Sequence, residues 1–374
     1  MNKPGPRDYL RQIRASNIPP LRIMNVCGGH ERSISLAGLR YLLPAHVQLI
    51  PGPGCPVCVC PEEDIRFAVQ LSFLKDTIVT SFGDMLRVPL RSMNGSTDEI
   101  YSLESARQHG GRVIPIASPL DVLSLAEQHP EQNIVFFVVG FETTLAPVAA
   151  MLAQGLPANV RLLVSAKRTA PIVQHLLQST TNNIDALIAP GHVATIMGTD
   201  EWRFVSEQYR KPCAVAGFDQ LSVLSAINAI TQQHHSADFH VENCYRGVAR
   251  AEGNPFAIAT IERFFDIDGS RWRGIGRVEN SGFRLKPEFK NLDTHDYYAS
   301  VYAQALEETG KHDMPRACAC GKVVMGSILP HQCKLYGATC TPESPAGPCM
   351  VSSEGACHIW WQAAQHRPLE VGLS

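Results

Sequence analysis

The chain has 374 residues, of which 45% are hydrophobic and 18% charged, and its formal net charge is −2. This length and composition are typical of a globular protein with two or three domains, each able to bury its own core. The balanced charge argues against nucleic acid as a partner. No segment approaches the ~18 uninterrupted apolar residues of a membrane span, and the first residues lack the apolar core of a signal peptide. We therefore expect a cytoplasmic protein with neither nucleic-acid nor membrane partners.

Short apolar runs alternate with amphipathic stretches through the first two thirds of the chain, which predicts alternating strands and helices. The expected strands are Leu21–Val26, Val47–Ile50, Thr77–Ser81, Arg112–Ile116, Ile134–Val139, Arg161–Val164, Ala186–Ala189 and Ala214–Ala216. The expected helices are Glu62–Leu74, Ser102–Gln108, Pro119–Gln128, Thr144–Gln154, Ala170–Ser179 and Leu221–His234. Several strands are nearly continuous in Val, Ile, Leu and Phe, as is typical of parallel strands buried on both faces.

This order of elements predicts an α/β fold with two small doubly wound parallel-sheet domains and a loop-rich iron–sulfur domain. We place the α/β domains at residues 17–129 and 130–240, divided at the polar stretch His129–Gln132. After about Val241 the chain is richer in Gly, Arg and Pro, and a cysteine-rich tail follows. Residues 241–374 are therefore expected to form the third domain, which the N-terminal residues 1–16 could join.

Several predicted strands end in turns that combine glycine with an acidic residue or histidine. These turns are Asn25–His30, Ser81–Asp84, Val139–Thr144, Ala189–His192 and Ala216–Asp219. Ligands of open α/β sheets gather at the carboxyl ends of the strands. Glu142, Thr143 and His192 are therefore candidates for lining a functional cleft, and the structural alternative is that they cap helices or shape turns.

Cys27 and His30 form a first candidate site, because Cys27-Gly-Gly-His30 directly follows a predicted strand. The two glycines allow a tight turn, so the thiol and the imidazole can point toward one position. Together they suit a soft or borderline metal such as iron. The alternative is a buried cysteine beside a histidine that caps a helix.

Cys55 and Cys58 form a second candidate site in the run Cys55-Pro-Val-Cys58-Val-Cys60. This spacing is typical of redox-active dithiols, and the start of the following helix would lower the pKa of a nearby thiol. The competing interpretation is half of a zinc site. Cys60 is either a third participant or simply buried.

The last sixty residues contain six of the twelve cysteines. In a reducing compartment such a concentration indicates metal binding or catalysis rather than a disulfide framework. The wide gaps and the absence of paired zinc knuckles favour a [4Fe–4S] site over a zinc ribbon. The six cysteines are Cys318, Cys320, Cys333, Cys340, Cys349 and Cys357, and the pattern alone does not show which four bind.

Taken together, these motifs resemble the HypD family of hydrogenase maturation proteins. The similarity runs through Asn25–Glu31, Pro51–Cys58, Val139–Thr144, Ala189–Val193, Cys318–Gly321 and Cys340–Cys357. Each motif alone is weak, but their order and spacing cover nearly the whole chain. The resemblance implies that the cluster is held by Cys318, Cys333, Cys340 and Cys357, which are separated by 14, 6 and 16 residues.

The resemblance further implies a redox-active scaffold, rather than a conventional turnover enzyme, for assembling the Fe(CN)₂CO unit of [NiFe]-hydrogenases. Members of the family act with a small partner, HypC, and receive cyanide-derived ligands from HypE, which is supplied by HypF. The hydrogenase large subunit is then an indirect partner. Carried over to this sequence, Cys27 would bind the iron with a cysteine of HypC, and His30 would lie close by. Cys55 and Cys58 would form a dithiol coupled to the [4Fe–4S] cluster.

Two other classes of function remain open from the residues themselves. One is a thiol–disulfide oxidoreductase with an attached iron–sulfur cluster, which would depend on Cys55 and Cys58 and not on Cys27. The other is an interaction module stabilised by zinc.

Overall fold

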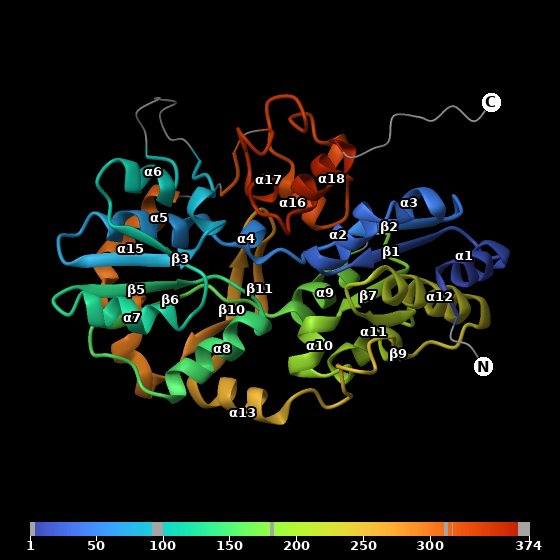
Figure 1. Cartoon of the computed structure of the whole chain (residues 1–374), viewed down its shortest axis with the longest axis horizontal. Helices are drawn as coiled ribbons and strands as arrows, with labels where there is room; N and C mark the ends of the chain where they lie inside the picture. Colours follow the sequence, from blue (N-terminus) through green and yellow to red (C-terminus); the bar gives the residue numbers. More distant parts are fainter. Residues whose placement is uncertain (1–3, 92–99, 180–182, 310–312, 316, 366–374) are drawn as a thin grey trace.

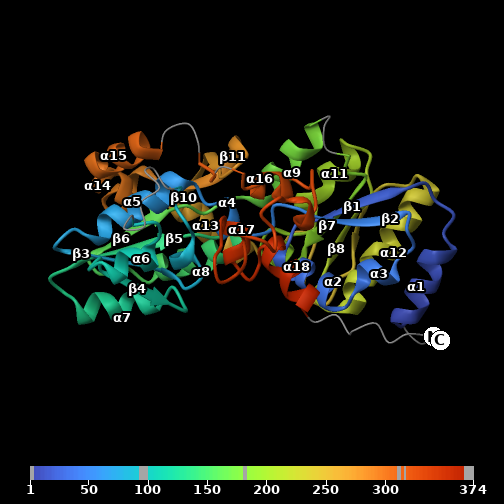
Figure 2. The same cartoon turned by 90° about the horizontal axis from the view of Figure 1, so that it is seen from above.

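The computed structural model describes residues 4–91, 100–179, 183–309, 313–315 and 317–365. Two α/β lobes lie side by side along the long axis, and residues 320–365 sit between them (Figures 1 and 2). Within the described residues, none of the helices combines the length and apolar character that crossing a bilayer requires.

One lobe is built on a five-stranded parallel sheet with the order β2-β1-β7-β8-β9. Its strands are β1 (Leu21–Asn25), β2 (Val47–Pro51), β7 (Ala186–Pro190), β8 (Cys213–Ala216) and β9 (Val241–Asn243). One face is covered by α1 (Pro6–Ala15), α2 (Gly28–Leu36), α3 (Leu39–Leu42) and α12 (Gln220–Ser236). The other face is covered by α9 (Thr169–Gln178), α10 (Gly191–Met197), η2 (Asp200–Trp202) and α11 (Arg203–Glu207). Cover on both faces explains why the inner strands are apolar throughout.

The other lobe is built on a four-stranded parallel sheet with the order β4-β3-β5-β6. Its strands are β3 (Thr77–Phe82), β4 (Val113–Ile116), β5 (Asn133–Val138) and β6 (Val160–Val164). Helices α5 (Glu62–Ser72) and α6 (Leu103–Gln108) and the 3₁₀ turn η1 (Met85–Arg87) cover one face. Helices α7 (Asp121–Gln128) and α8 (Glu142–Ala153) cover the other. Successive residues of β5 therefore alternate between two apolar cores, as Phe136 and Phe137 do.

Most of the chain after the last parallel strand packs on the four-stranded lobe. The elements are α13 (Pro255–Phe264), the antiparallel pair β10 (Phe265–Trp272) and β11 (Gly276–Leu285), η3 (Pro287–Leu292), α14 (Thr294–Tyr297) and α15 (Ala299–Thr309). Helix α13 lies against α8 and helix α15 against α5. The cysteine-rich tail then carries only short elements before its last helix. These are α16 (Cys320–Val324), η4 (Pro330–Gln332), α17 (Pro348–Val351) and α18 (Ala356–Gln365).

The structure confirms the predicted fold class, with two parallel-sheet lobes and a loop-rich region that carries the cysteines. All eight predicted strands and all six predicted helices are present, with ends shifted by one or two residues. The elements that were not predicted include α1, α2, β9, the strands β10 and β11, and the helices that follow them.

The predicted division between residues 129 and 130 does not follow the sheets. Strand β3 pairs with β5 across this point, and β1 pairs with β7. Each sheet therefore takes strands from both predicted α/β domains, because the chain leaves the five-stranded sheet after β2 and returns at β7. Local apolar patterns identify a strand, but its neighbours are chosen by packing over long sequence distances.

The predicted C-terminal domain of residues 241–374 is also too large. Val241–Asn243 extends the five-stranded sheet, and α13 to α15 pack on the four-stranded lobe. The N-terminal helix α1 packs on α12, where Ile13 is buried in the core of the five-stranded lobe, and it does not join the tail. The amphipathic character of this helix explains its position, because its apolar face needs a core to cover it.

Candidate functional site

The candidate site lies at the carboxyl ends of β1 and β7. These strands are neighbours, but the chain leaves β1 for β2 on one side and β7 for β8 on the other. Open α/β sheets bind their ligands at such a reversal of strand order. Cys27 follows β1 and His192 follows β7, so the topology brings both predicted residues to this position.

Cys27 is the residue immediately before helix α2, and it is half-buried. Burial raises the pKa of Cys27 to about 11, although the backbone N–H groups of His30 and Gly29 donate to the sulfur and oppose this shift. The nearby carboxylate of Glu354 raises the pKa further. A thiol in these surroundings stays protonated until a positive charge, such as that of a metal ion, favours the thiolate.

His30 is completely buried one helical turn after Cys27. Its Nε2–H donates to the carbonyl oxygen of Ala216 at 2.9 Å, and its Nδ1 has no hydrogen-bond partner among the described residues. Burial lowers the pKa of His30 to about 4, so the ring is neutral and Nδ1 keeps its lone pair. An imidazole with one nitrogen fixed by a carbonyl and the other unprotonated is the arrangement found in histidine metal ligands.

Phe218 separates the two histidines. Its ring centroid lies 4.9 Å from that of His30 and 3.8 Å from that of His192, which is exposed. A Cβ on Gly29 would lie 2.6 Å from the Phe218 ring, so this helix position requires glycine. We did not assign Phe218 a role from the sequence, although it stands in one of the strand-end turns, after β8.

Cys55 and Cys58 form a disulfide across the short helix α4 (Pro56–Val59), with their Cα atoms 5.3 Å apart. The loop before it touches Cys27: the amide of Gly28 donates to the carbonyl of Gly54 at 3.2 Å, and a Cβ on Gly54 would lie 2.4 Å from the Cα atom of Cys27. Cys55 and Cys58 are only 5% and 1% exposed. The disulfide therefore adjoins the first site and is shielded from solvent.

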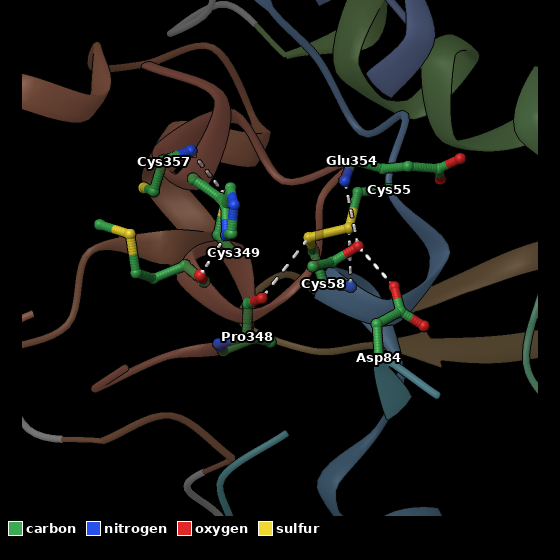
Figure 3. Close-up of a disulfide and its surroundings, with 10 residues drawn as sticks. Cys55, Cys58, Asp84, Pro348, Cys349, Glu354 and Cys357 are labelled. Atoms are coloured by element: carbon green, nitrogen blue, oxygen red, sulfur yellow. Dashed lines mark hydrogen bonds between the residues drawn. A yellow bond between two sulfur atoms is a disulfide. The ribbon is translucent and has the colours of Figure 1, made fainter. Parts of the chain in front are cut away.

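A segment of the tail covers the same region. The carbonyl oxygen of Pro348 lies 3.9 Å from the Cys58 sulfur. Glu354 contacts helix α2, since a Cβ on Gly28 would lie 2.5 Å from the Cβ of Glu354. Figure 3 shows the disulfide among Pro348, Glu354 and Asp84. The sequence analysis did not single out Glu354, which lies within the tail motif Cys340–Cys357.

The four-stranded sheet reaches the site through Asp84, which follows β3. Its carboxylate accepts a hydrogen bond of 2.8 Å from the hydroxyl of Ser352. Burial raises the pKa of Glu354, and the negative charge of Asp84 adds to this shift. The site is therefore assembled from both sheets and the tail, with a second carboxylate near its edge.

The tail brings four of its cysteines into one hydrogen-bonded series, Cys318, Cys320, Cys349 and Cys357. Hydrogen bonds from Cys320 and Cys357 hold the pKa of Cys349 well below its usual value, while those of Cys318 and Cys357 are raised. Cys340 interacts electrostatically with Cys320 and Cys318.

The predicted ligand set is therefore brought together only in part. Cys318, Cys340 and Cys357 share interactions with Cys320, whereas the described contacts of Cys333 do not include another cysteine. No group of three or more metal-ligating side chains in the described residues surrounds a single metal position. The donor chemistry, six mostly buried thiols in a loop-rich segment, fits a thiolate-bound iron–sulfur cluster.

Glu142 and Thr143 lie at the first turn of helix α8. The Glu142 carboxylate is buried and accepts hydrogen bonds from the amide of Thr169, at 2.8 Å, and from its hydroxyl, so it caps helix α9. Burial raises the pKa of Glu142 to about 7, despite these hydrogen bonds. For Glu142 the contacts are those of a helix cap, while the half-buried Thr143 has no described contact with Cys27.

This geometry can be compared with known proteins. The HypD family model, described as "Hydrogenase formation hypA family", matches residues 6–364. The chain belongs to the HypD family. It is 39% identical over 367 residues to the Hydrogenase maturation factor HypD of Escherichia coli (strain K12), with 96% of this chain and 94% of that protein covered. It is 38% identical to that of Rhizobium leguminosarum bv. viciae, with 96% and 93% covered. The HypD similarity therefore includes both sheets, the disulfide loop and the tail.

Proposed function

We propose that this protein is a scaffold on which the Fe(CN)₂CO unit of a [NiFe]-hydrogenase is assembled, with the iron as its cargo. Cys27 supplies one thiolate to that iron, and a cysteine of a HypC-type partner supplies another. HypE delivers the cyanide ligands after HypF has supplied it, and the hydrogenase large subunit receives the product. Membership of a family of hydrogenase maturation factors supports the pathway, and the site supports the residue roles.

The observation that carries this proposal is the surroundings of Cys27. Its half-buried sulfur lies at the strand reversal of the five-stranded sheet, and the lone pair of His30 Nδ1 lies one turn away. Backbone N–H groups from the start of α2 already point at the sulfur and stabilise negative charge there. The thiol loses its proton when the iron binds, and Glu354, whose carboxylate interacts electrostatically with Cys27, is a candidate to receive it.

In this proposal the disulfide serves the same site as an internal two-electron store. Reduction takes up two electrons and two protons, breaks the S–S bond and leaves the two thiols of Cys55 and Cys58. The cluster held by the tail would supply one-electron chemistry from the Pro348 side of the disulfide. The chain's own contribution is to exclude water from both sulfurs and to hold them against the Cys27 loop.

The same burial makes a general thiol–disulfide oxidoreductase the weaker candidate. Such an enzyme must present its attacking thiol to a substrate disulfide, and exchange rates depend on this access. Cys55 is 5% exposed and Cys58 1% exposed, with Pro348 against the second sulfur. A protein substrate would reach them only after the tail moved aside.

The test is infrared spectroscopy of the protein purified without oxygen together with its small partner. The wild type should show sharp cyanide and CO stretches, and Cys27→Ala should lose them while keeping the iron and labile sulfide of the tail. Cys244→Ala is the matched control, because this half-buried cysteine follows β9, which β7 and β8 separate from β1 in the sheet, and it should leave the bands unchanged.

Normal bands in Cys27→Ala would overturn the proposed role of this residue. A blank spectrum from a wild-type complex that carries its cluster would favour the oxidoreductase instead.

A further inference from the structure

We propose that the buried guanidinium of Arg273 is a positioning residue that sets the reduction potential of the cofactor held by the cysteine-rich tail. This inference rests on the proposed function, because it presupposes a redox cofactor bound by tail thiolates. It concerns a residue at the turn of the β10–β11 hairpin, which no sequence motif singled out.

Arg273 is fixed in the interior by several polar contacts. Its side chain and that of Glu62 are both 0% exposed and form an ion pair of 2.9 Å. The guanidinium also donates to the carbonyl oxygens of Asp313, at 2.7 Å, and Pro89, at 2.8 Å. Its remaining terminal nitrogen is buried and has no hydrogen-bond partner in the described part of the chain. This buried cation therefore has N–H groups that no described residue accepts.

The hairpin turn places this cation between the two sulfur-bearing segments. The amide of Arg273 donates to the carbonyl of Val59 at 3.0 Å, in the helix that carries Cys58. The next residue, Gly274, packs on the tail, where a Cβ on Gly321 would lie 2.3 Å from the Gly274 oxygen. The guanidinium interacts electrostatically with the thiol of Cys318.

Stability alone does not account for a buried pair of this kind. Removing two charges from water costs several kcal/mol per ion, and well-packed apolar residues often give equal or greater stability. Glu62 is moreover shared between Arg273 and Arg66, whose second partner Glu308 is partly exposed to solvent. Glu62 therefore compensates the charge of Arg273 only in part.

A fixed positive charge beside the tail favours whichever cofactor state is more negative. Adding one electron to a thiolate-bound cluster adds one negative charge, and in a low-dielectric interior a nearby cation stabilises that charge. Arg273 should therefore raise the reduction potential. Lysine at this position would keep the charge, whereas glutamine would keep polar contacts and lose it.

The experiment is an anaerobic redox titration of the loaded full-length protein, followed by electron paramagnetic resonance. Arg273→Gln should lower the midpoint potential enough to change the ratio of reduced to oxidised protein at least tenfold, which for one electron is about 59 mV. Arg273→Lys should stay near the wild type. Arg277→Gln is the matched control, since it removes a solvent-exposed cation of the same hairpin and should leave the potential unchanged.

A buried Glu62 without its partner could prevent Arg273→Gln from folding. In that case Glu62→Gln, which keeps Arg273 and removes the negative charge paired with it, replaces it and should raise the midpoint potential. A wild-type potential in Arg273→Gln, or in Glu62→Gln where Arg273→Gln does not fold, would overturn the inference, as would an equal shift in Arg277→Gln. Each of these results would leave the proposed function intact. A wild type that binds no iron and sulfide in its tail would overturn the cofactor assignment and this inference with it.

Discussion

The indole nitrogen of Trp360 donates a hydrogen bond of 2.6 Å to the buried carboxylate of Glu31. Glu31 lies on α2, one turn after Cys27, and Trp360 lies on α18, three residues after Cys357. The same carboxylate pairs with Arg40 at 2.8 Å and accepts from Asn25. This contact therefore joins the helix that carries Cys27 to the helix that carries a cysteine of the tail.

We expect Trp360→Phe to destabilise the protein by about 1–3 kcal/mol, because a buried charged acceptor loses a donor. The free energy of unfolding from denaturant titration measures this loss. Trp361→Phe is the control on the same helix, since no described hydrogen bond links Trp361 to Glu31. Equal losses in the two variants would show that aromatic packing, and not the hydrogen bond, is responsible.

Gly54→Ala should separate the disulfide loop from Cys27. Its Cβ would lie 2.4 Å from the backbone of Cys27, and neither backbone segment can rotate away as a side chain can. We expect a loss of about 1–3 kcal/mol from overpacking. Gly83→Ala, where a Cβ meets nothing within 4 Å, should change stability by less than about 0.5 kcal/mol. Denaturant titration of the two variants measures both changes in the free energy of unfolding. A Gly54→Ala protein as stable as Gly83→Ala would contradict the close contact between Gly54 and the backbone of Cys27.

The buried carboxyl group of Glu142 makes stability depend on pH. Burial raises the pKa of Glu142 from its ordinary value of 4.5 to about 7, so folding favours the protonated form. The stability that this group contributes is fully present below pH 4.5 and is lost as the pH rises through 7, by up to about 3 kcal/mol. Glu142→Gln should remove this loss, and Glu131→Gln, on the surface, should not. If the free energies of unfolding of the wild type and Glu142→Gln ran parallel between pH 5 and 8.5, this prediction would be refuted.

His295 should give a pH dependence at higher pH. Burial by itself lowers the pKa of His295, but hydrogen bonds to Asp293 and Asp64 outweigh it and raise the pKa from 6.5 to about 9. Its stabilising contribution is thus fully present below pH 6.5 and is lost as the pH rises through 9. We expect His295→Gln to be less stable than the wild type at pH 6 and to approach it at pH 9.5. The exposed His175→Gln should match the wild type at both pH values.

Sequence reasoning predicted the elements well and their partners poorly. The run Ile134–Val139 predicted a strand because its residues are apolar on both faces, and β5 lies there. Nothing in that run indicates that β5 pairs with β3, or that β1 pairs with β7. Helix α1 was missed because its apolar face consists of only a few residues, Tyr9, Leu10 and Ile13.

Some residues of the candidate site could likewise be recognised from the sequence, and others only from the structure. Cys27 and the Cys55–Cys58 pair were recognised because chemistry-bearing residues stand close together beside glycines and prolines. Glu354 and Arg273 could not be recognised, since their local sequence resembles an ordinary turn. Their positions follow from contacts with segments far away in the chain, such as that between Arg273 and Glu62.

By itself the sequence determined which segments form strands and helices and which residues can carry thiol and metal chemistry, because periodicity, turn residues and reactive side chains are local properties. Only the tertiary structure decided that Pro348 lies against Cys58, 290 positions away, and that Glu354 lies against the helix that begins after Cys27. Those contacts depend on how two sheets and a tail pack around shared apolar cores, and packing sums small interactions over residues that no local pattern connects.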